Sequence, residues 1–346
     1  MRRKDKEDAI TKREPKQFSV YTDLAIEARE MLYTDEEESA GEEPEGIRMT
    51  VEENEEMGIK LTWVQIVNEE GVRQMGKPVG NYITLESNEM KENSVEVHEE
   101  IIRVLADKLG QLHKLKKKGT VLIVGLGNWK VTPDALGPKV VGKVLVTRHI
   151  AECLPEEINV NVRPVGAISP GVMGITGIET VEIVKGVVER IRPDLVIAID
   201  ALAARRTARI NSTIQMSDTG VAPGGGMGNK RLPLNEEALG VPVIAIGVPT
   251  VVDAATLVND TMDHMLDAMI AETERGGEFY RMLKDLAEED KYALIKDVLN
   301  PYTGNMFVSP KEVDAVIERL SNIIANAINI AVHPGITRED INRYMG

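Results

Sequence analysis

The sequence predicts an α/β protein with a mostly parallel sheet that helices cover on both faces. Short aliphatic runs, bounded by glycine or charged residues, recur along the middle of the chain and are typical of buried strands. They lie at 120–125, 159–168, 195–200, 210–217 and 241–247. Helical patterns alternate with these runs at about 135–152, 178–191 and 253–271. The alternation indicates parallel pairing, because parallel strands need a crossover connection, which is usually a helix.

A small β region precedes this alternation, and a helical part follows it. Strand-like runs occur early in the chain, at 47–51, 61–67 and 82–85. Ser94 is a candidate N-cap for a helix with apolar residues at helical spacing. These patterns predict a small β region at about 47–86, an α/β core at about 95–275 and a helical C-terminal part at 276–346.

The composition excludes several classes of protein. Of the 346 residues, 42% are hydrophobic, which is enough for a sizeable core, and the formal net charge is −15. This excess of acid argues against direct binding of nucleic acid, which needs a basic face. A lone cysteine, Cys153, rules out an intramolecular disulfide and suits a reducing compartment. The sequence has no apolar run of about 18 residues, so we expect no membrane span and a cytoplasmic location.

Two of the predicted strands end next to an aspartate. The run at 121–124 leads into a Gly-Leu-Gly-Asn turn at 125–128, and Asp134 follows seven residues after Gly127. The run at 194–200 ends on Asp200 itself. Ligands of open parallel sheets bind beyond the carboxyl ends of the strands. Asp134 and Asp200 are therefore candidates for one active site.

Each aspartate alone could be a helix cap or a strand-end cap, whereas two together favour a functional pair. Carboxylates that share a site do not both ionise easily, so one member holds a proton while the other acts as a base. Such a pair can activate water against an amide and protonate the leaving nitrogen. The residues by themselves therefore point to a hydrolase.

Other motifs give weaker signals. The turn at 125–130 begins like a dinucleotide fingerprint but lacks the third glycine, and the glycine-rich stretch at 224–230 lacks the spacing of a phosphate-binding loop. Four residues could share one helix face and bind a metal, although a solvated acidic stripe is the favoured interpretation. They are Asp260, Asp263, His264 and Asp267. We expect neither a metal nor a cofactor.

Four segments resemble the germination protease family of spore-forming bacteria. They read GLGNWKVTPDALGP at 125–138, IDALAAR at 199–205, SVYTDLAIEA at 19–28 and PGGGMGN at 223–229. The resemblance extends from about residue 18 to the C-terminus. An acidic segment at 34–46 has no counterpart in it.

The resemblance implies an aspartic-type endopeptidase that starts the degradation of the small acid-soluble proteins coating spore DNA. It places the catalytic carboxylates on Asp134 and Asp200, and the protein in the spore core or forespore cytoplasm. It also implies a homotetrameric zymogen that removes its own N-terminal segment, and a fold shared with hydrogenase maturation peptidases.

The resemblance further implies a processing site. Family substrates are cut after Glu within a Thr-Glu-hydrophobic-Ala sequence, and residues 22–25 read Thr-Asp-Leu-Ala. We therefore expect self-cleavage between Asp23 and Leu24, with 1–23 as a propeptide and 24–346 as a single peptidase domain. An acidic side chain before the bond calls for a cation. The candidates, which could equally be solvated surface charges, are Arg205, Arg206, Lys230 and Arg231.

Two alternatives remain at this stage. A metal-linked maturation peptidase of related fold would depend on a divalent ion. A nucleotide-binding or regulatory α/β protein would instead use the turn at 125–128 for a phosphate, and nucleotide would then stabilise it.

Overall fold

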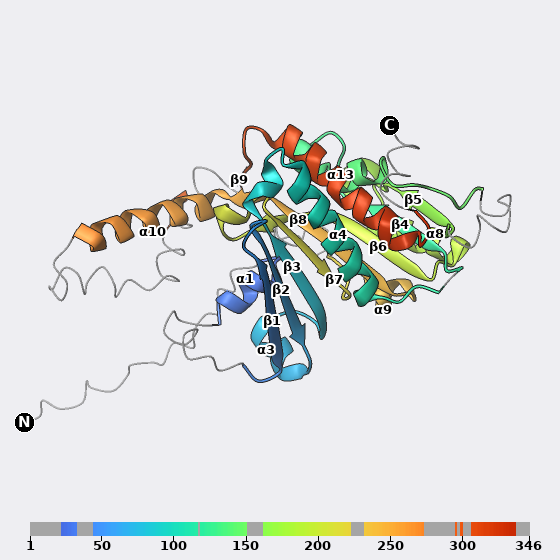
Figure 1. Ribbon diagram of the computed structural model, residues 1–346, viewed down its shortest axis with the longest axis horizontal. Helices are drawn as coiled ribbons and strands as arrows, with labels where there is room; N and C mark the ends of the chain where they lie inside the picture. The colour runs from blue at the N-terminus through green and yellow to red at the C-terminus, as the bar shows by residue number, and fades with distance from the viewer. Residues whose placement is uncertain are drawn as a thin grey trace, which may run out of the picture.

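The computed structural model describes residues 22–32, 44–116, 118–150, 162–222, 232–272, 295, 298–299 and 306–336. These residues form one nine-stranded sheet with helices on both faces, which confirms the predicted α/β class (Figure 1). Most of the acidic segment at 34–46 lies outside the described residues.

The half of the sheet that carries the candidate site is parallel. Its strand order is β5-β4-β6-β8, and all three pairings are parallel. The bounds are β4 Val121–Gly125, β5 Val165–Ile168, β6 Leu195–Ala204 and β8 Val243–Asp253. These strands consist almost entirely of aliphatic residues because helices bury them on both faces.

The other half of the same sheet is antiparallel. Its order continues from β8 through β7 and β3 to β2 and β1, and a short β9 also pairs with β8. The bounds are β1 Ile47–Asn54, β2 Ile59–Ile66, β3 Gly80–Glu86, β7 Thr213–Ser217 and β9 Phe307–Val308. The predicted small β region is thus part of the main sheet. The prediction of parallel pairing holds for the half of the sheet that contains β4 and β6, and the other half is antiparallel. The connection from β6 to β7 is too short for the crossover helix that a parallel strand needs.

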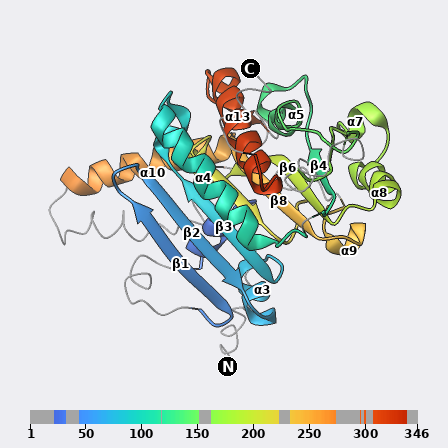
Figure 2. The same cartoon turned by 45° about the vertical axis from the view of Figure 1, so that its right-hand side comes forward.

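Helices cover the two faces in distinct sets. One face packs against the long helices α4 Val95–Leu112 and α13 Val313–Val332, which lie side by side in both views, and against α5 Leu136–Val141 (Figures 1 and 2). On the other face, α8 Thr180–Ile191 and α9 Glu236–Leu239 cover the parallel half, while α1 Ala25–Glu30 and α3 Glu69–Met75 cover the antiparallel half.

The alternation along β6 decides which face carries Asp200. Leu195, Ile197 and Ile199 belong to the core beneath α4 and α13, whereas Val196 and Ala198 belong to the core beneath α8. Successive strand residues point to opposite faces. Asp200 therefore lies on the second face, which α8 and α1 also occupy.

The helix expected at 135–152 is much shorter in the structure. A 3-10 helix, η2 Thr132–Asp134, leads into α5, which ends at Val141 before Gly142. Past that glycine the chain bonds to other elements: Leu145 N donates to Asn329 Oδ1 of α13 at 2.8 Å, and Thr147 N donates to Val165 O at 3.0 Å. The strand expected at 159–168 is present at Val165–Ile168, and residues 151–161 lie outside the described part.

The remaining described elements are short, with one exception. They are η1 Asn88–Lys91, α7 Met173–Thr176, η3 Thr207–Arg209 and the long α10 Ala254–Glu272, which projects from the sheet (Figure 1). Among the described helices, only α13 has the length and apolar composition of a membrane span. Most of α13 is buried against α4 and the sheet, which accounts for its apolar character.

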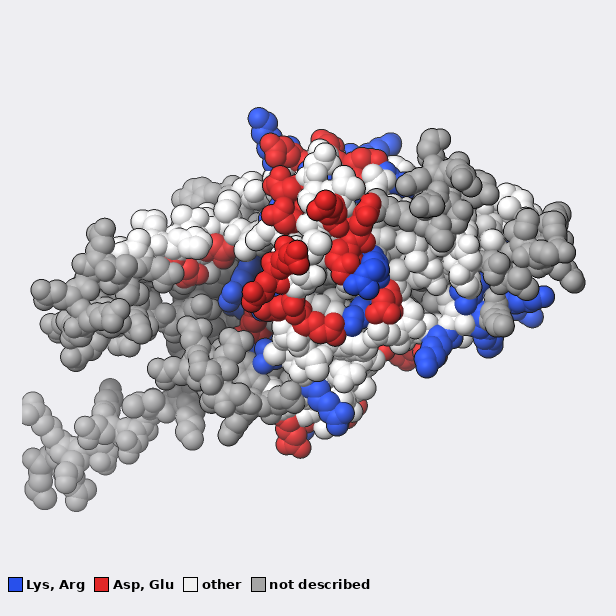
Figure 3. Space-filling view, in the orientation of Figure 1, with Lys and Arg blue, Asp and Glu red and all other residues white. Residues whose placement is uncertain are grey.

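Acidic side chains gather on the face that α4 covers (Figure 3). Glu96, Glu99 and Glu100 of α4 contribute to them, and Glu52 of β1 reaches the same helix at Lys108. The acidic character predicted from composition is therefore visible as a patch, and that patch would repel a phosphate backbone.

The end of α13 carries a buried histidine with a strongly shifted pKa. His333 is fully buried; its Nδ1 accepts from Arg163 N at 3.2 Å, so its Nε2, 3.3 Å from Leu145 O, carries the proton. Burial, aided by the charge of Arg163, lowers the pKa of His333 to about 4. Folding therefore favours the neutral ring.

We predict that this histidine makes stability depend on pH between about 4 and 6.5. In that window the unfolded chain binds a proton that the folded chain does not, so stability falls as pH decreases, by on the order of 3 kcal/mol in total. Urea unfolding of the wild type and His333→Gln at pH 7 and pH 4.5 measures this loss. The wild type should lose more stability than the variant, and equal losses would contradict the prediction.

Candidate active site

The loop that carries Asp134 is fixed by a close backbone contact. Gly127, at the end of the turn after β4, has a φ of 109°, and a Cβ atom there would lie 2.0 Å from the carbonyl oxygen of Asp134. Asn128 N donates to that same oxygen at 3.0 Å. Only glycine fits at position 127, which explains why the turn and Asp134 occur together in the sequence.

A second glycine brings this loop onto β6. A Cβ at Gly137 would lie 2.6 Å from the carbonyl oxygen of Ile199, and Leu126 N donates to that oxygen at 2.8 Å. Both η2 and α5 pack directly against β6. The structure thus places the Asp134 loop against β6, the strand that contains Asp200.

Asp200 is 4% exposed, and its Oδ1 accepts from Ala201 N at 2.9 Å. In the sheet it pairs with Gly247 of β8, which in turn pairs with Gln215 of β7. Gly247 contributes no side chain, and the side chain of Leu202 occupies the space above it. The row Asp200, Gly247, Gln215 therefore runs across the sheet on one face.

The predicted processing site lies beside this row. The Asp23 carboxylate accepts from Ala203 N of β6 at 3.1 Å, three residues after Asp200. Leu24 is fully buried and packs with Ile26 against Leu202. The residues on both sides of the predicted bond thus contact β6.

Polar side chains from two other elements hold the backbone around this bond. Lys77 Nζ, just after α3, donates to the carbonyl oxygens of Thr22 and Asp23, each at 3.1 Å. Gln215 Nε2 donates to the Asp23 carbonyl oxygen at 3.1 Å, and its Oε1 accepts from Ala25 N at 2.6 Å. Burial lowers the pKa of Lys77, although the charges of Asp23 and Glu27 act in the opposite direction.

A buried carboxylate anchors the segment on the other side of the bond. Glu27 of α1 is 1% exposed and accepts from the backbone N–H groups of Arg205 and Arg206 at 2.9 to 3.1 Å. The hydroxyl of Thr22 also donates to Glu27, and Leu24 N donates to that hydroxyl at 3.2 Å. Glu27 therefore ties the residues around the predicted bond to the end of β6.

The structure describes two of the four predicted substrate-binding cations. Arg205 and Arg206 lie directly after β6, where their backbone groups bind Glu27. The Arg206 side chain is 60% exposed, with Nε 3.8 Å from Glu30. Lys230 and Arg231 lie outside the described residues.

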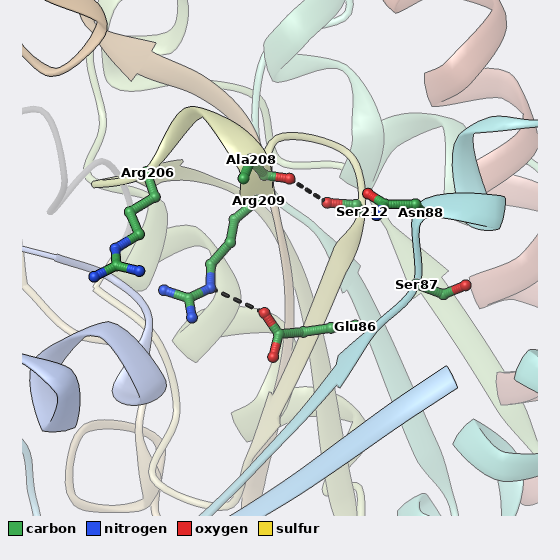
Figure 4. A pocket seen from close by; sticks show the side chains of 7 residues that line it. All are labelled: Glu86, Ser87, Asn88, Arg206, Ala208, Arg209 and Ser212. Atoms are coloured by element: carbon green, nitrogen blue, oxygen red, sulfur yellow. Dashed lines mark hydrogen bonds and ion pairs between the residues drawn. The ribbon is translucent and has the colours of Figure 1, made fainter. Parts of the chain in front are cut away.

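Arg209, which was not predicted from the sequence, links α1 to the sheet. Its guanidinium binds Glu30, approaches Glu27 at 3.4 Å and donates from Nε to Glu86 at 3.0 Å (Figure 4). Burial opposes its charge, yet these carboxylates raise the pKa of Arg209 above its usual value. Burial also opposes the charge of Glu30, which by itself would raise the pKa of that carboxyl. The hydrogen bond and the charge of Arg209 outweigh this effect, so the pKa of Glu30 is lowered. No motif in the sequence around position 209 predicts that Glu27, Glu30 and Glu86 would be its partners.

Neither of two hollows on the surface is lined by the carboxylates. One, of about 210 Å³, lies between Glu86, Arg206 and Arg209 (Figure 4), and is smaller than the roughly 300 Å³ at which ligand pockets begin. The other, of about 930 Å³, runs along the acidic surface of α4.

Two of the acidic residues of α10, Asp260 and Asp263, have structural partners. Asp260 accepts from both the backbone N and the hydroxyl of Thr207, at 2.8 and 2.7 Å, and Asp263 accepts from Asn259. The side chain of Asp267 is outside the description. Among the described residues, no group of three or more His, Cys, Asp and Glu side chains is arranged to hold a metal ion.

The fold and this edge of the sheet define the class of protein. Two aspartates come to the carboxyl end of adjacent parallel strands, and a peptide segment of the chain itself lies bound beside one of them. Carboxylates at such an edge can activate water against an amide, which favours a hydrolase.

Comparison with known proteins identifies the family: the chain belongs to the germination proteases. The family model described as "Germination protease" matches residues 25–277 and 267–345. A germination protease of Clostridium tetani is 52% identical over 95% of this chain and 100% of its own length. One from Caldanaerobacter subterraneus is 49% identical (95% and 98%), and one from Bacillus cereus is 45% identical (94% and 97%).

A solved structure also aligns with the fold. It is the [NiFe] hydrogenase maturation protease HycI from Thermococcus kodakarensis, with 18% identity, a TM-score of 0.31, and coverage of 65% of this chain and 98% of that one. At that score the similarity supports no conclusion about the site.

We predict that removing Arg209 releases α1. Arg209→Met would leave Glu27, Glu30 and Glu86 without this shared cation in a buried place, at a cost of about 3–5 kcal/mol of stability. The matched control is Arg103→Met, which breaks an exposed pair with Glu100 and should cost about 1 kcal/mol or less. Denaturant unfolding of both variants tests this, and a similar cost for the two would contradict it.

Proposed function

We propose that this germination protease is an aspartic-type endopeptidase made as a zymogen, which cuts its own chain between Asp23 and Leu24. After that cut it degrades small acid-soluble spore proteins in the forespore or spore core, and it works as a homotetramer. One observation carries the proposal: residues 22–25 are bound across β6 and β7, where the Asp23 carboxylate accepts from Ala203 N, three residues after the buried Asp200, and Gln215 binds the backbone of Asp23 and Ala25.

The proposed chemistry assigns one proton transfer to each carboxylate. One member of the Asp134–Asp200 pair removes a proton from water, and the water oxygen adds to the carbonyl carbon of Asp23. The other member, protonated at the start, gives its proton to the Leu24 nitrogen as the C–N bond breaks. The products are a new carboxylate on Asp23 and a new amine on Leu24.

The bound segment also accounts for the expected substrate sequence. The side chain before the bond reaches a backbone N–H of Ala203, which favours an acidic oxygen acceptor. The side chain after the bond enters a fully buried apolar site against Leu202, which requires a hydrophobic residue. The cations Arg205, Arg206, Lys230 and Arg231 remain predicted contributors to the acidic preference.

The same contacts support residues 1–23 as an inhibitory propeptide and 24–346 as the peptidase domain. While Thr22 and Asp23 occupy the end of β6, another peptide has no access to those groups. Removal of 1–23 would vacate them.

We predict that both carboxylates are required. Asparagine keeps the shape of aspartate but does not titrate, so Asp134→Asn and Asp200→Asn should each slow self-processing of the full chain by about 10²–10⁴-fold. Asp107→Asn, exposed on α4, is the matched control and should process normally. Processing is followed by intact mass, with circular dichroism as a check of folding. Near-normal processing by either folded variant would disprove the pair, and loss of activity with chelator would then favour a metal-dependent peptidase.

We also predict where the processed chain begins. N-terminal sequencing should give Leu24 as the first residue. Leu24→Asp would bury an unpaired charge, which costs several kcal/mol, so its processing should fall by about 100-fold or more. Leu257→Asp, at an exposed position of α10, should process at the wild-type rate. A processed chain that starts elsewhere would reject this site.

A further inference from the structure

We infer that Lys77 and Gln215 form the binding site for the carbonyl oxygen of the bond that is cut, and that they stabilise the negative charge which develops on that oxygen. This inference rests on the proposed function, because it takes Asp23–Leu24 as a substrate bond. It assigns to both residues a direct contact with the reacting group.

The geometry is that of an oxyanion site. Lys77 Nζ and Gln215 Nε2 each lie 3.1 Å from the Asp23 carbonyl oxygen, and they approach it from different elements, the α3–β3 connection and β7. Donors that stabilise such an oxygen in enzymes lie about 2.7–3.1 Å from it. One donor carries a full charge, and charge-assisted hydrogen bonds are the stronger kind.

The sheet register places this pair near the proposed catalytic carboxylate. Gln215 and Asp200 both pair with Gly247, so they lie on the same face and two strands apart, or roughly 10 Å between Cα atoms. Leu202 lies above Gly247, and Leu24 packs on Leu202. The residue after the bond is therefore seated between Gln215 and Asp200.

Lys77 is half-buried, and desolvating an ammonium has a free-energy cost that holding a peptide in place does not by itself require. Burial disfavours the charged form of Lys77, and a neutral donor could bind two carbonyl oxygens without that desolvation cost. A charge at this position has a larger effect once the carbonyl oxygen becomes an anion. Water gives a proton to one carboxylate as it adds to the Asp23 carbonyl carbon, and the carbonyl oxygen becomes an anion. The electron pair of that oxygen then re-forms the C=O bond as the C–N bond breaks, and the Leu24 nitrogen takes the proton of the other carboxylate.

Gln215 offers an almost isosteric test. Its Oε1 accepts from Ala25 N while its Nε2 donates to the Asp23 oxygen, so Gln215→Glu keeps an acceptor for Ala25 but replaces the donor with a second acceptor that carries negative charge. Lys77→Met keeps the aliphatic stem and removes the ammonium, and Lys77→Arg restores a charged donor. Lys185→Met, exposed on α8, makes the same chemical change away from the site.

The experiment has two arms. In the first, self-processing of each full-length variant is timed by intact mass. In the second, a recognition sequence for an unrelated protease is placed before Leu24, so that every variant is processed to the same N-terminus. The kcat and KM of each are then measured with a peptide of residues 19–28, and circular dichroism confirms folding.

The second arm separates a role in catalysis from a role in anchoring the propeptide. If Lys77 and Gln215 bind the reacting oxygen, Gln215→Glu and Lys77→Met each lower kcat on the peptide by about 10²–10³-fold, Lys77→Arg recovers part of it, and Lys185→Met is unchanged. If they only anchor residues 22 and 23, the processed variants keep wild-type kcat, and the inference is overturned.

Failure of the proposed function gives a different result. If the wild-type chain is cut elsewhere, or if Asp134→Asn and Asp200→Asn stay active, the proposed function fails. If cleavage occurs after Asp23 and needs both aspartates, while Lys77→Met and Gln215→Glu retain wild-type kcat, only the inference about the carbonyl site fails.

Discussion

The placement of the N-terminal segment depends on the buried carboxylate of Glu27. A buried charge is tolerated only with several partners, and Glu27 has the Thr22 hydroxyl, the N–H groups of Arg205 and Arg206, and the nearby Arg209. Glu27 follows the Asp23–Leu24 bond, whereas Thr22 precedes it and the other partners come from the end of β6 and from η3. A shift of the segment by one residue would leave the carboxylate unpaired, so this one group fixes which peptide bond faces the sheet edge.

The opposite side of the site depends on backbone contact instead of charge. Gly127 and Gly137 let the loop after β4 touch the backbone of Asp134 and of Ile199 at distances that no side chain would allow. Asp134 therefore reaches the edge of β6 because of the path of the chain. The N-terminal segment, held by an ion cluster, and the Asp134 loop, held by glycine packing, both contact β6.

The sequence predicted the parts of this arrangement that are local. The aliphatic strands at 121–125 and 195–200 and their terminal aspartates are visible as continuous patterns. The antiparallel half of the sheet was not predicted, because the pairing of β3 with β7 joins residues far apart in the chain. An alternation of apolar and polar residues indicates a strand but does not identify the strand it pairs with. Lys77 lies 54 residues from Asp23 and belongs to no motif. Gln215 is an amide within an otherwise largely apolar strand, which is a sign of a buried hydrogen bond, but the sequence does not show which residue is its partner.

Under the proposed function, the contacts that make residues 22–25 a good substrate also make them a good inhibitor. Lys77, Gln215 and Ala203 all bind groups that any acidic-hydrophobic peptide would present. A tethered segment competes at an effective concentration of about millimolar, which a separate substrate rarely reaches. Affinity alone would then never let a spore protein displace the segment. A single cut changes this, because it turns the segment before Leu24 into a product that is free to diffuse away. Under this proposal, the covalent link between residue 23 and the rest of the chain is what keeps the site closed.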